Sequence, residues 1–222
     1  MLCVPKASLT ITAVLCLFAT AVLASAVAHG NGPYGFEDPA LNWLGRPSAV
    51  QAWNDLAELL TAPAVVAALV VALVVGLLKH AAWRVLLYAA CAVTAFLVSE
   101  HLVKPLVQRT YYGELTFPSG SVTAVSATVL ALWFALGPRL GRRARGVALA
   151  IGVAWVLLIS LAVVGGRWHT PVDAVGSILL SVGIVTAGVA ILESTGTRRL
   201  STRVGRRFGT VRRRPRAGGR TP

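Results

Sequence analysis

Long apolar stretches separated by short polar segments dominate the hydrophobic pattern of this chain. They cover 8–28, 60–78, 85–103, 120–137, 147–164 and 172–192. Each stretch is close to the roughly 20 residues that an α-helix needs to cross about 30 Å of hydrocarbon. The pattern therefore predicts an all-α fold, that of a polytopic membrane protein built as a six-transmembrane-helix bundle.

The overall composition agrees with this prediction and excludes an ordinary soluble domain. Hydrophobic residues make up 56% of the chain and charged residues only 13%, and the mean hydropathy is +0.72. The three cysteines, Cys3, Cys16 and Cys91, are too scattered for metal-ligand spacing. The spans also lack central charges and obvious breaks, which argues against the midplane binding site of a transporter.

The placement of basic residues orients the predicted bundle. Lys6, Lys79, Arg84 and the arginines of 139–145 fall on one side of a six-span topology, together with ten arginines after residue 193. The positive-inside rule makes this side the cytoplasm. Both termini are then cytoplasmic, and loops 29–59, 104–119 and 165–171 are extracytoplasmic, as in a multi-pass protein of a bacterial-type inner cell membrane.

The chain divides into a membrane domain and a basic tail. Residues 1–196 form the predicted membrane domain, and 197–222 form a basic cytoplasmic tail that is too polar and arginine-rich to fold alone. A tail tethered at the inner leaflet meets anionic lipid before nucleic acid, so we expect membrane-surface binding. The first span has a second interpretation, a cleaved signal peptide ending at 26–28, which leaves the later topology unchanged.

Loop 29–59 is the longest connection between the predicted spans. Several glycines and prolines predict turns in its first part, and a stretch from Trp43 to Leu60 has helical spacing. Trp43 and Trp53 fit a helix that lies in the headgroup region, where indole rings are favoured. Generic anchoring at the interface accounts for both tryptophans.

A histidine and a carboxylate stand together where the last span begins. His169 and Asp173 are four residues apart, and Arg167 precedes them by two positions. Ionisable groups beside hydrocarbon are costly, so their presence there indicates a functional site.

Two further segments place polar groups on the same side of the membrane. Ser119, Gly120 and Ser121 open the fourth span, where free backbone N–H groups bind anions. Lys104 and Arg109 precede them and supply positive charge. Together with the histidine and carboxylate, these residues point to phosphate chemistry.

The order Lys104-x4-Arg109, Pro118-Ser119-Gly120 and His169-x3-Asp173 resembles the three signature segments of the type 2 phosphatidic acid phosphatase family. These membrane lipid phosphatases are related to the vanadium haloperoxidases. The resemblance implies an enzyme that removes a phosphate or diphosphate from a lipid, of the phosphatidate or polyprenyl diphosphate type, at the extracytoplasmic face. It requires neither metal nor other cofactor.

The resemblance also assigns roles to individual residues. His169 is the nucleophile that forms a phosphohistidine, and Asp173 holds its imidazole in the useful tautomer. Cations and helix-start amides bind the phosphate oxygens and compensate their charge in the transition state. The phosphate-binding set is Lys104, Arg109, Ser119, Gly120, Ser121 and Arg167.

The chain departs from the family pattern at several polar positions. Ser121 stands where the family has the histidine that protonates the leaving oxygen, and Val163 and Ala162 replace an arginine and a serine. Tyr111 and Tyr112 stand where an Arg-Pro pair closes the first segment. Losing general acid catalysis typically costs about 10²–10⁴ in rate.

The departures leave the source of acid and charge open. Arg167 replaces the lost positive charge if its loop turns the side chain inward. A diphosphate suits such a site better than a monophosphate ester, because phosphate is the better leaving group. The alternative function is a catalytically silent relative that binds phospholipid headgroups or membrane partners. Candidate acids are Tyr111, Tyr112, Glu114 and His101.

Simpler structural roles also fit the candidate residues. Thr170 and Asp173 fit a helix cap at N-cap and N3, with proline at N1. Lys104 can pair with Glu100 four residues earlier, and Arg109 can reach lipid headgroups from the interface.

Overall fold

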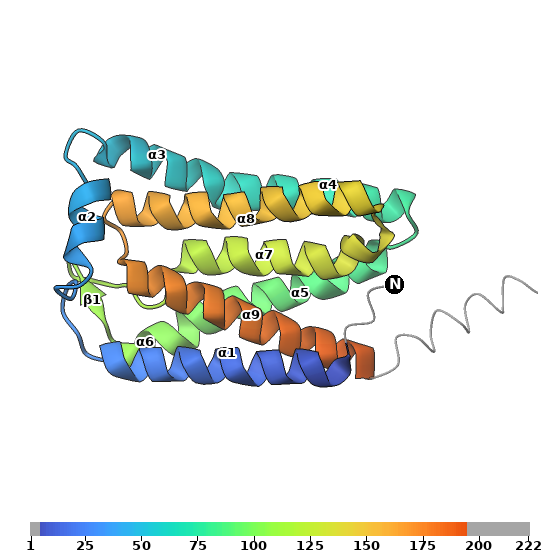
Figure 1. Cartoon of the computed structure of the whole chain (residues 1–222), viewed down its shortest axis with the longest axis horizontal. Coiled ribbons are helices and arrows are strands. Elements are labelled where there is room, and N and C mark those ends of the chain that lie inside the picture. The colour runs from blue at the N-terminus through green and yellow to red at the C-terminus, as the bar shows by residue number, and fades with distance from the viewer. Residues whose placement is uncertain (1–4, 195–222) are drawn as a thin grey trace, which may run out of the picture.

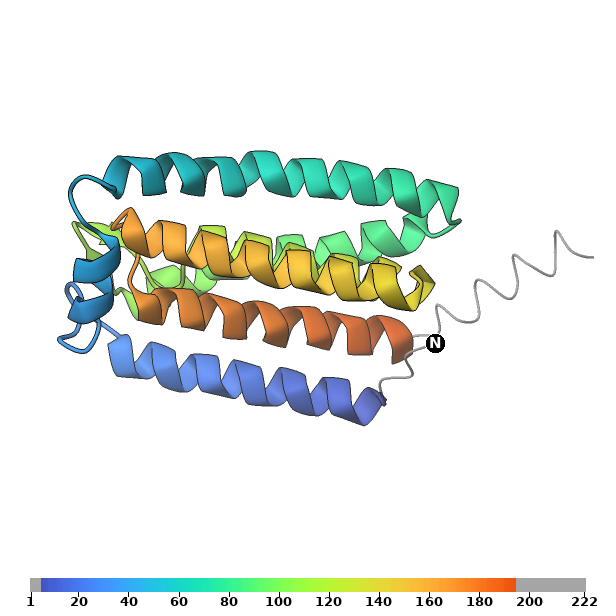
Figure 2. The same ribbon diagram turned by 45° about the horizontal axis from the view of Figure 1, so that its top comes forward.

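Six helical rods make up the chain in a computed structural model that describes residues 5–194 (Figures 1 and 2). All six are long and apolar enough to cross a membrane, which confirms the predicted spans of a multi-pass membrane protein. The predicted basic tail at 197–222 lies outside the described residues. The rods are α1 (Lys6–Val27), α3 (Val50–Leu60) with α4 (Ala62–Leu78), α5 (Ala82–Val98) with the π-helical turn η1 (Ser99–Val103) and α6 (Lys104–Val107), α7 (Gly120–Leu136) with the 3₁₀ turn η2 (Gly137–Arg139), α8 (Arg142–Gly165) and α9 (Pro171–Ser194).

The connections divide the bundle into two ends. The loop end carries the short helix α2 (Asp38–Leu44) and a hairpin of β1 (Thr110–Tyr111) and β2 (Glu114–Leu115). The termini end carries the first residue of α1 and the last residue of α9, as Figure 1 shows. An even number of spans brings the two ends of the described chain to the same side, as the predicted topology requires.

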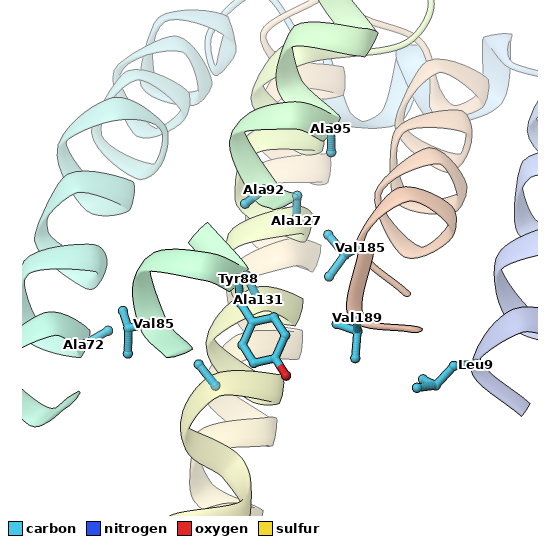
Figure 3. Packing of buried hydrophobic residues seen from close by; sticks show 11 residues of the cluster. Leu9, Ala72, Val85, Tyr88, Ala92, Ala95, Ala127, Ala131, Val185 and Val189 are labelled. Atoms are coloured by element: carbon cyan, nitrogen blue, oxygen red, sulfur yellow. The ribbon is translucent and has the colours of Figure 1, made fainter. Parts of the chain in front are cut away.

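Helix α7 lies at the centre of the bundle and packs against α5, α9, α8 and α4. Small residues let the helices approach closely, since a Cβ on Gly152 or Gly183 would meet the side chains of Val129 or Leu17. Such close packing drives helix association in membranes, because lipid tails are as apolar as the helices and the hydrophobic effect does not bring the helices together. Figure 3 shows the apolar cluster towards the termini end, with Tyr88 among alanine and valine side chains.

Two hydroxyl groups join α7 to α9 within this packing. Ser177 donates to the carbonyl of Ser119 at 3.0 Å, and Ser181 donates to the carbonyl of Thr123 at 3.1 Å. Both serines are fully buried. Because the two bonds are one helical turn apart, they fix α9 along α7 in register and set the relative positions of the two helix starts.

The helix predicted from Trp43 to Leu60 is confirmed only over Val50–Leu60, the range of α3. The chain breaks after α2 at Gly45, and α3 instead runs into α4 as one rod beside α8 (Figure 2). Trp53 explains the difference: its indole packs on Gly165 of α8 and donates to the carbonyl of Leu44 at 3.0 Å. Packing against the last residue of α8 therefore fixes this indole at the loop end of the bundle.

Candidate active site

Arg109 is the centre of a buried charge network at the loop end. Its side chain is 1% exposed, and one guanidinium nitrogen donates to Asp173 Oδ1 at 2.7 Å and to Thr170 Oγ1 at 2.9 Å. The other donates to Glu37 Oε2 at 2.7 Å, and the Tyr34 ring lies 5.1 Å away. The suggestion that Arg109 reaches the headgroups is therefore wrong, because two buried carboxylates hold it inside.

Glu37 is the member of this network that the sequence did not indicate. It is 1% exposed, and its Oε1 accepts from the backbone of Val172 at 3.1 Å. Its Oε2, which binds Arg109, also accepts from the backbone of Tyr34 at 2.8 Å. A buried arginine needs acidic partners, so the partner of Arg109 is to be expected among the acidic residues of the loops. The choice of Glu37 depends on how loop 29–59 folds back over α9.

Asp173 caps α9 and carries the histidine. Its Oδ2 accepts from the Thr170 backbone at 2.8 Å, which confirms the predicted cap. The Nδ1 of His169 lies 3.8 Å from the same oxygen, beyond hydrogen-bond distance, and has no partner among the described residues. The His169 side chain is 12% exposed, whereas Asp173 is fully buried beneath it. Only the histidine of this pair is open to a ligand.

Val163, which stands where the family has an arginine, binds the backbone of the turn that carries His169. Val163 is fully buried near the end of α8, and its carbonyl accepts from the backbone of Trp168 at 3.0 Å and of His169 at 3.2 Å. The valine therefore adds no charge to the site. It supplies an apolar wall and a backbone acceptor instead.

The starts of α7 and α9 are in direct contact. Ser119 caps α7 through Oγ, which accepts from Val122 at 3.5 Å, and its own amide donates to the Asp173 carbonyl at 3.5 Å. Ser119 is fully buried, while Ser121, on the first turn of α7, is half-buried. The structure thus brings the second and third segments together at one point of the loop end.

Glu100 occupies the space over the start of α7. Its carboxylate packs so closely on Gly120 that a Cβ there would overlap Oε1 and lie 3.0 Å from the carboxyl carbon. Lys104 pairs with it at 2.8 Å, as the four-residue spacing suggested. The positive end of a helix attracts anions, and here the anion over the helix comes from the chain itself.

Arg167 points towards α2 and the hairpin. Its guanidinium donates twice to the carbonyl of Gly45, at 2.8 and 3.1 Å. Hydrogen bonds from Tyr111 and Arg167 lower the pKa of Tyr112, which is 72% exposed. Burial, followed by the bond to Tyr112, raises the pKa of Tyr111 to about 12. Of the two tyrosines, Tyr112 is the stronger acid at neutral pH.

Comparisons with known proteins bear on the fold. No family model matches the chain, and no curated protein matches it either. One solved structure is similar at a TM-score of 0.68 and 16% sequence identity, over 84% of this chain and 98% of its own. It is the crystal structure of a transmembrane PAP2 type phosphatidylglycerolphosphate phosphatase from Bacillus subtilis. The chain has a PAP2-type fold. This agrees with the resemblance of the three segments to the type 2 phosphatases.

Proposed function

We propose that the chain is a membrane lipid phosphatase of the PAP2 type, with His169 as its nucleophile. One observation carries the proposal: in a PAP2-type fold, the imidazole of His169, which is 12% exposed, lies over buried Asp173, whose carbonyl accepts from Ser119 at the start of α7. The similar structure is a phosphatidylglycerolphosphate phosphatase. The substrate class here is a lipid monophosphate or diphosphate, reached from the extracytoplasmic leaflet.

The chemistry has two displacement steps. Nδ1 of His169 faces Asp173, so Nε2 attacks phosphorus while the bond to the leaving oxygen breaks. Water then attacks the phosphohistidine, the P–N bond breaks, and phosphate leaves. The Nδ1–H of His169 then donates a hydrogen bond to Asp173. The distance between Nδ1 and Oδ2 is 3.8 Å without substrate and shortens when substrate binds, since catalytic hydrogen bonds are often long before substrate binds.

The phosphate contacts come from groups near the site opening. Lys104 leaves its ion pair with Glu100 and binds one phosphate oxygen. The backbone amides of Gly120 and Ser121, at the start of α7, bind the other phosphate oxygens. Ser119 caps this helix. Arg109 stabilises Asp173, since both of its terminal nitrogens are engaged by carboxylates, and Arg167 adds charge from the loop.

The leaving group decides how well this site turns over. Ser121 cannot supply a proton near neutral pH, so an alkoxide leaves slowly while a phosphate leaves more easily. We therefore expect lipid diphosphates, such as a polyprenyl diphosphate, to be hydrolysed faster than phosphatidate-type monoesters.

Phosphate release from a panel of lipid mono- and diphosphates tests the proposal with purified full-length protein. His169→Ala should abolish release, because no other group forms the covalent intermediate. His80→Asn, at the termini end, should retain it, since asparagine tolerates the positive φ of 51° at this position. Equal release by His169→Ala protein would refute the proposed nucleophile.

A catalytically silent headgroup binder is the second candidate function. The Glu100 carboxylate over Gly120 favours it, because a substrate phosphate has to displace this charge. Ser121→His separates the two candidates. In an enzyme limited by leaving-group protonation it should raise monoester hydrolysis by up to roughly 10²-fold and diphosphate hydrolysis less. In a silent binder, folded Ser121→His and His169→Ala proteins should both lack turnover.

A further inference from the structure

A hollow with both polar and apolar walls lies at the termini end, opposite the candidate active site. It is small and open to solvent, and it is lined by residues of α1, α5, α7, η2 and α9. Its wall contains one cation, Arg84, and one carboxylate, Glu193, with the indole of Trp133 beside them. Leu9 and Val189 add apolar surface. The hollow therefore combines both signs of charge with an apolar wall.

Arg84 is a fixed cation with a spare donor. One guanidinium nitrogen donates to the Tyr88 hydroxyl at 3.2 Å and to the Phe134 carbonyl at 3.4 Å, and the group lies 5.3 Å from the Tyr88 ring. The buried Nε has no partner among the described residues. Arg84 also stands in the first turn of α5, where the helix dipole disfavours a cation. An anion in the hollow would offset the unfavourable position of Arg84 in the helix dipole.

Glu193 has the opposite problem at the end of α9. It stands in the last turn, where the helix dipole disfavours a carboxylate. Within residues 5–194 neither Glu193 nor Arg84 forms an ion pair. The two charges nevertheless line the same hollow, and both act on the Tyr88 hydroxyl. A ligand that carries a phosphate and an ammonium group complements the pair.

Two tryptophans place the hollow at headgroup depth. Trp83 precedes Arg84 and is 64% exposed, and Trp133 lines the hollow near the end of α7. Indole rings are favoured at the membrane–water interface. A phospholipid in the surrounding bilayer reaches such a hollow more readily than a soluble anion does.

We propose that this hollow binds the headgroup of a zwitterionic aminophospholipid, with its phosphate on Arg84 and its primary ammonium on Glu193. The site is separate from the catalytic proposal, and its occupant is bound without being hydrolysed. Arg139, close enough to Arg84 for electrostatic repulsion, strengthens the attraction for phosphate. The headgroup then bridges Arg84 of α5 and Glu193 of α9, two helices that no loop connects directly.

Lipid binding to the purified full-length chain tests the site, with native mass spectrometry as the readout. The probes are short-chain phosphatidylethanolamine, short-chain phosphatidylglycerol and inorganic phosphate. Arg84→Gln should weaken phosphatidylethanolamine binding about tenfold, or about 1.4 kcal/mol. Arg143→Gln, which removes an exposed charge outside the hollow, should leave it unchanged.

Glu193→Gln gives a second test that does not depend on the Arg84 contacts. Glu193 is exposed, so its replacement should preserve the fold. The variant should bind phosphatidylethanolamine about tenfold more weakly relative to phosphatidylglycerol, and Glu58→Gln should keep the wild-type ratio. An unchanged ratio in Glu193→Gln, tighter wild-type binding of phosphatidylglycerol, or competition by equimolar inorganic phosphate would each overturn the proposal.

Discussion

The two ends of the bundle handle charge in opposite ways. The loop end holds seven of the eight acidic residues, and its central arginine is buried between two of them. The termini end holds Glu193 alone, beside seven cations within residues 5–194. Buried charges need partners, whereas solvated charges do not. The difference shows that one helical framework can support a fixed charge network at one end and an open electrostatic surface at the other.

The largest contrast expected between the ends is topological. Positive-inside orientation places the cation-rich termini end in the cytoplasm and the acidic loop end outside. In a cysteine-free background, Glu114→Cys should react with an impermeant thiol reagent in intact cells, and Ser201→Cys should react only after lysis. Reaction of Ser201→Cys alone in intact cells would reverse the orientation and the proposed outer-leaflet substrate.

Removing one cation from each end should have very different effects on stability. Arg109→Met leaves two buried carboxylates without their partner, so the free energy of unfolding should fall by about 3–5 kcal/mol. Arg143→Met removes an exposed charge and should change it by less than about 0.5 kcal/mol. Denaturation of both proteins in the same detergent measures the difference. Similar small losses would mean that the Arg109 network contributes little.

Glu100 tests whether the start of α7 is an anion site. Its carboxylate lies over Gly120, so Glu100→Gln should raise the affinity for inorganic phosphate about tenfold, by removing a like charge from the positive helix end. Calorimetric titration measures the affinity, and Glu58→Gln is the control for lost acidic charge. Unchanged or weaker binding would show that phosphate does not bind over Gly120.

The smallest expected effect is a pH dependence at the hairpin. The folded pKa of Tyr111 is about 12, above the ordinary value of 10.0. The neutral phenol is therefore favoured in the folded state, and its contribution is complete below about pH 10 and lost as pH rises through 12. Tyr111→Phe should lose less stability than wild type between these values in thermal unfolding. Parallel alkaline losses in both proteins would contradict the shift.

The sequence predicts the span positions well because hydrophobic length determines them. The last span was expected at 172–192, and α9 covers Pro171–Ser194. The cap of α9 was predictable too, since Thr170 and Asp173 are local neighbours. The pairing of Arg109 with Glu37 was not, because 72 residues separate them and several loop acids were equivalent in the sequence. The position of Glu100 over Gly120 likewise depends on how two separate helices meet.

The π-helical turn at Ser99–Val103 makes chain length important near the site. Such a turn accommodates one residue more than an α-helical turn, and each residue of an α-helix rotates the chain by about 100°. A single-residue deletion there, with the turn reverting to α, would leave α6 and Lys104 facing almost the same way, because five π-helical residues and four α-helical residues rotate the chain by nearly the same angle. A deletion in the regular part of α5 would instead turn α6 and Lys104 by about 100° around the helix axis. We therefore expect this short segment to tolerate a single deletion better than the rest of α5 does.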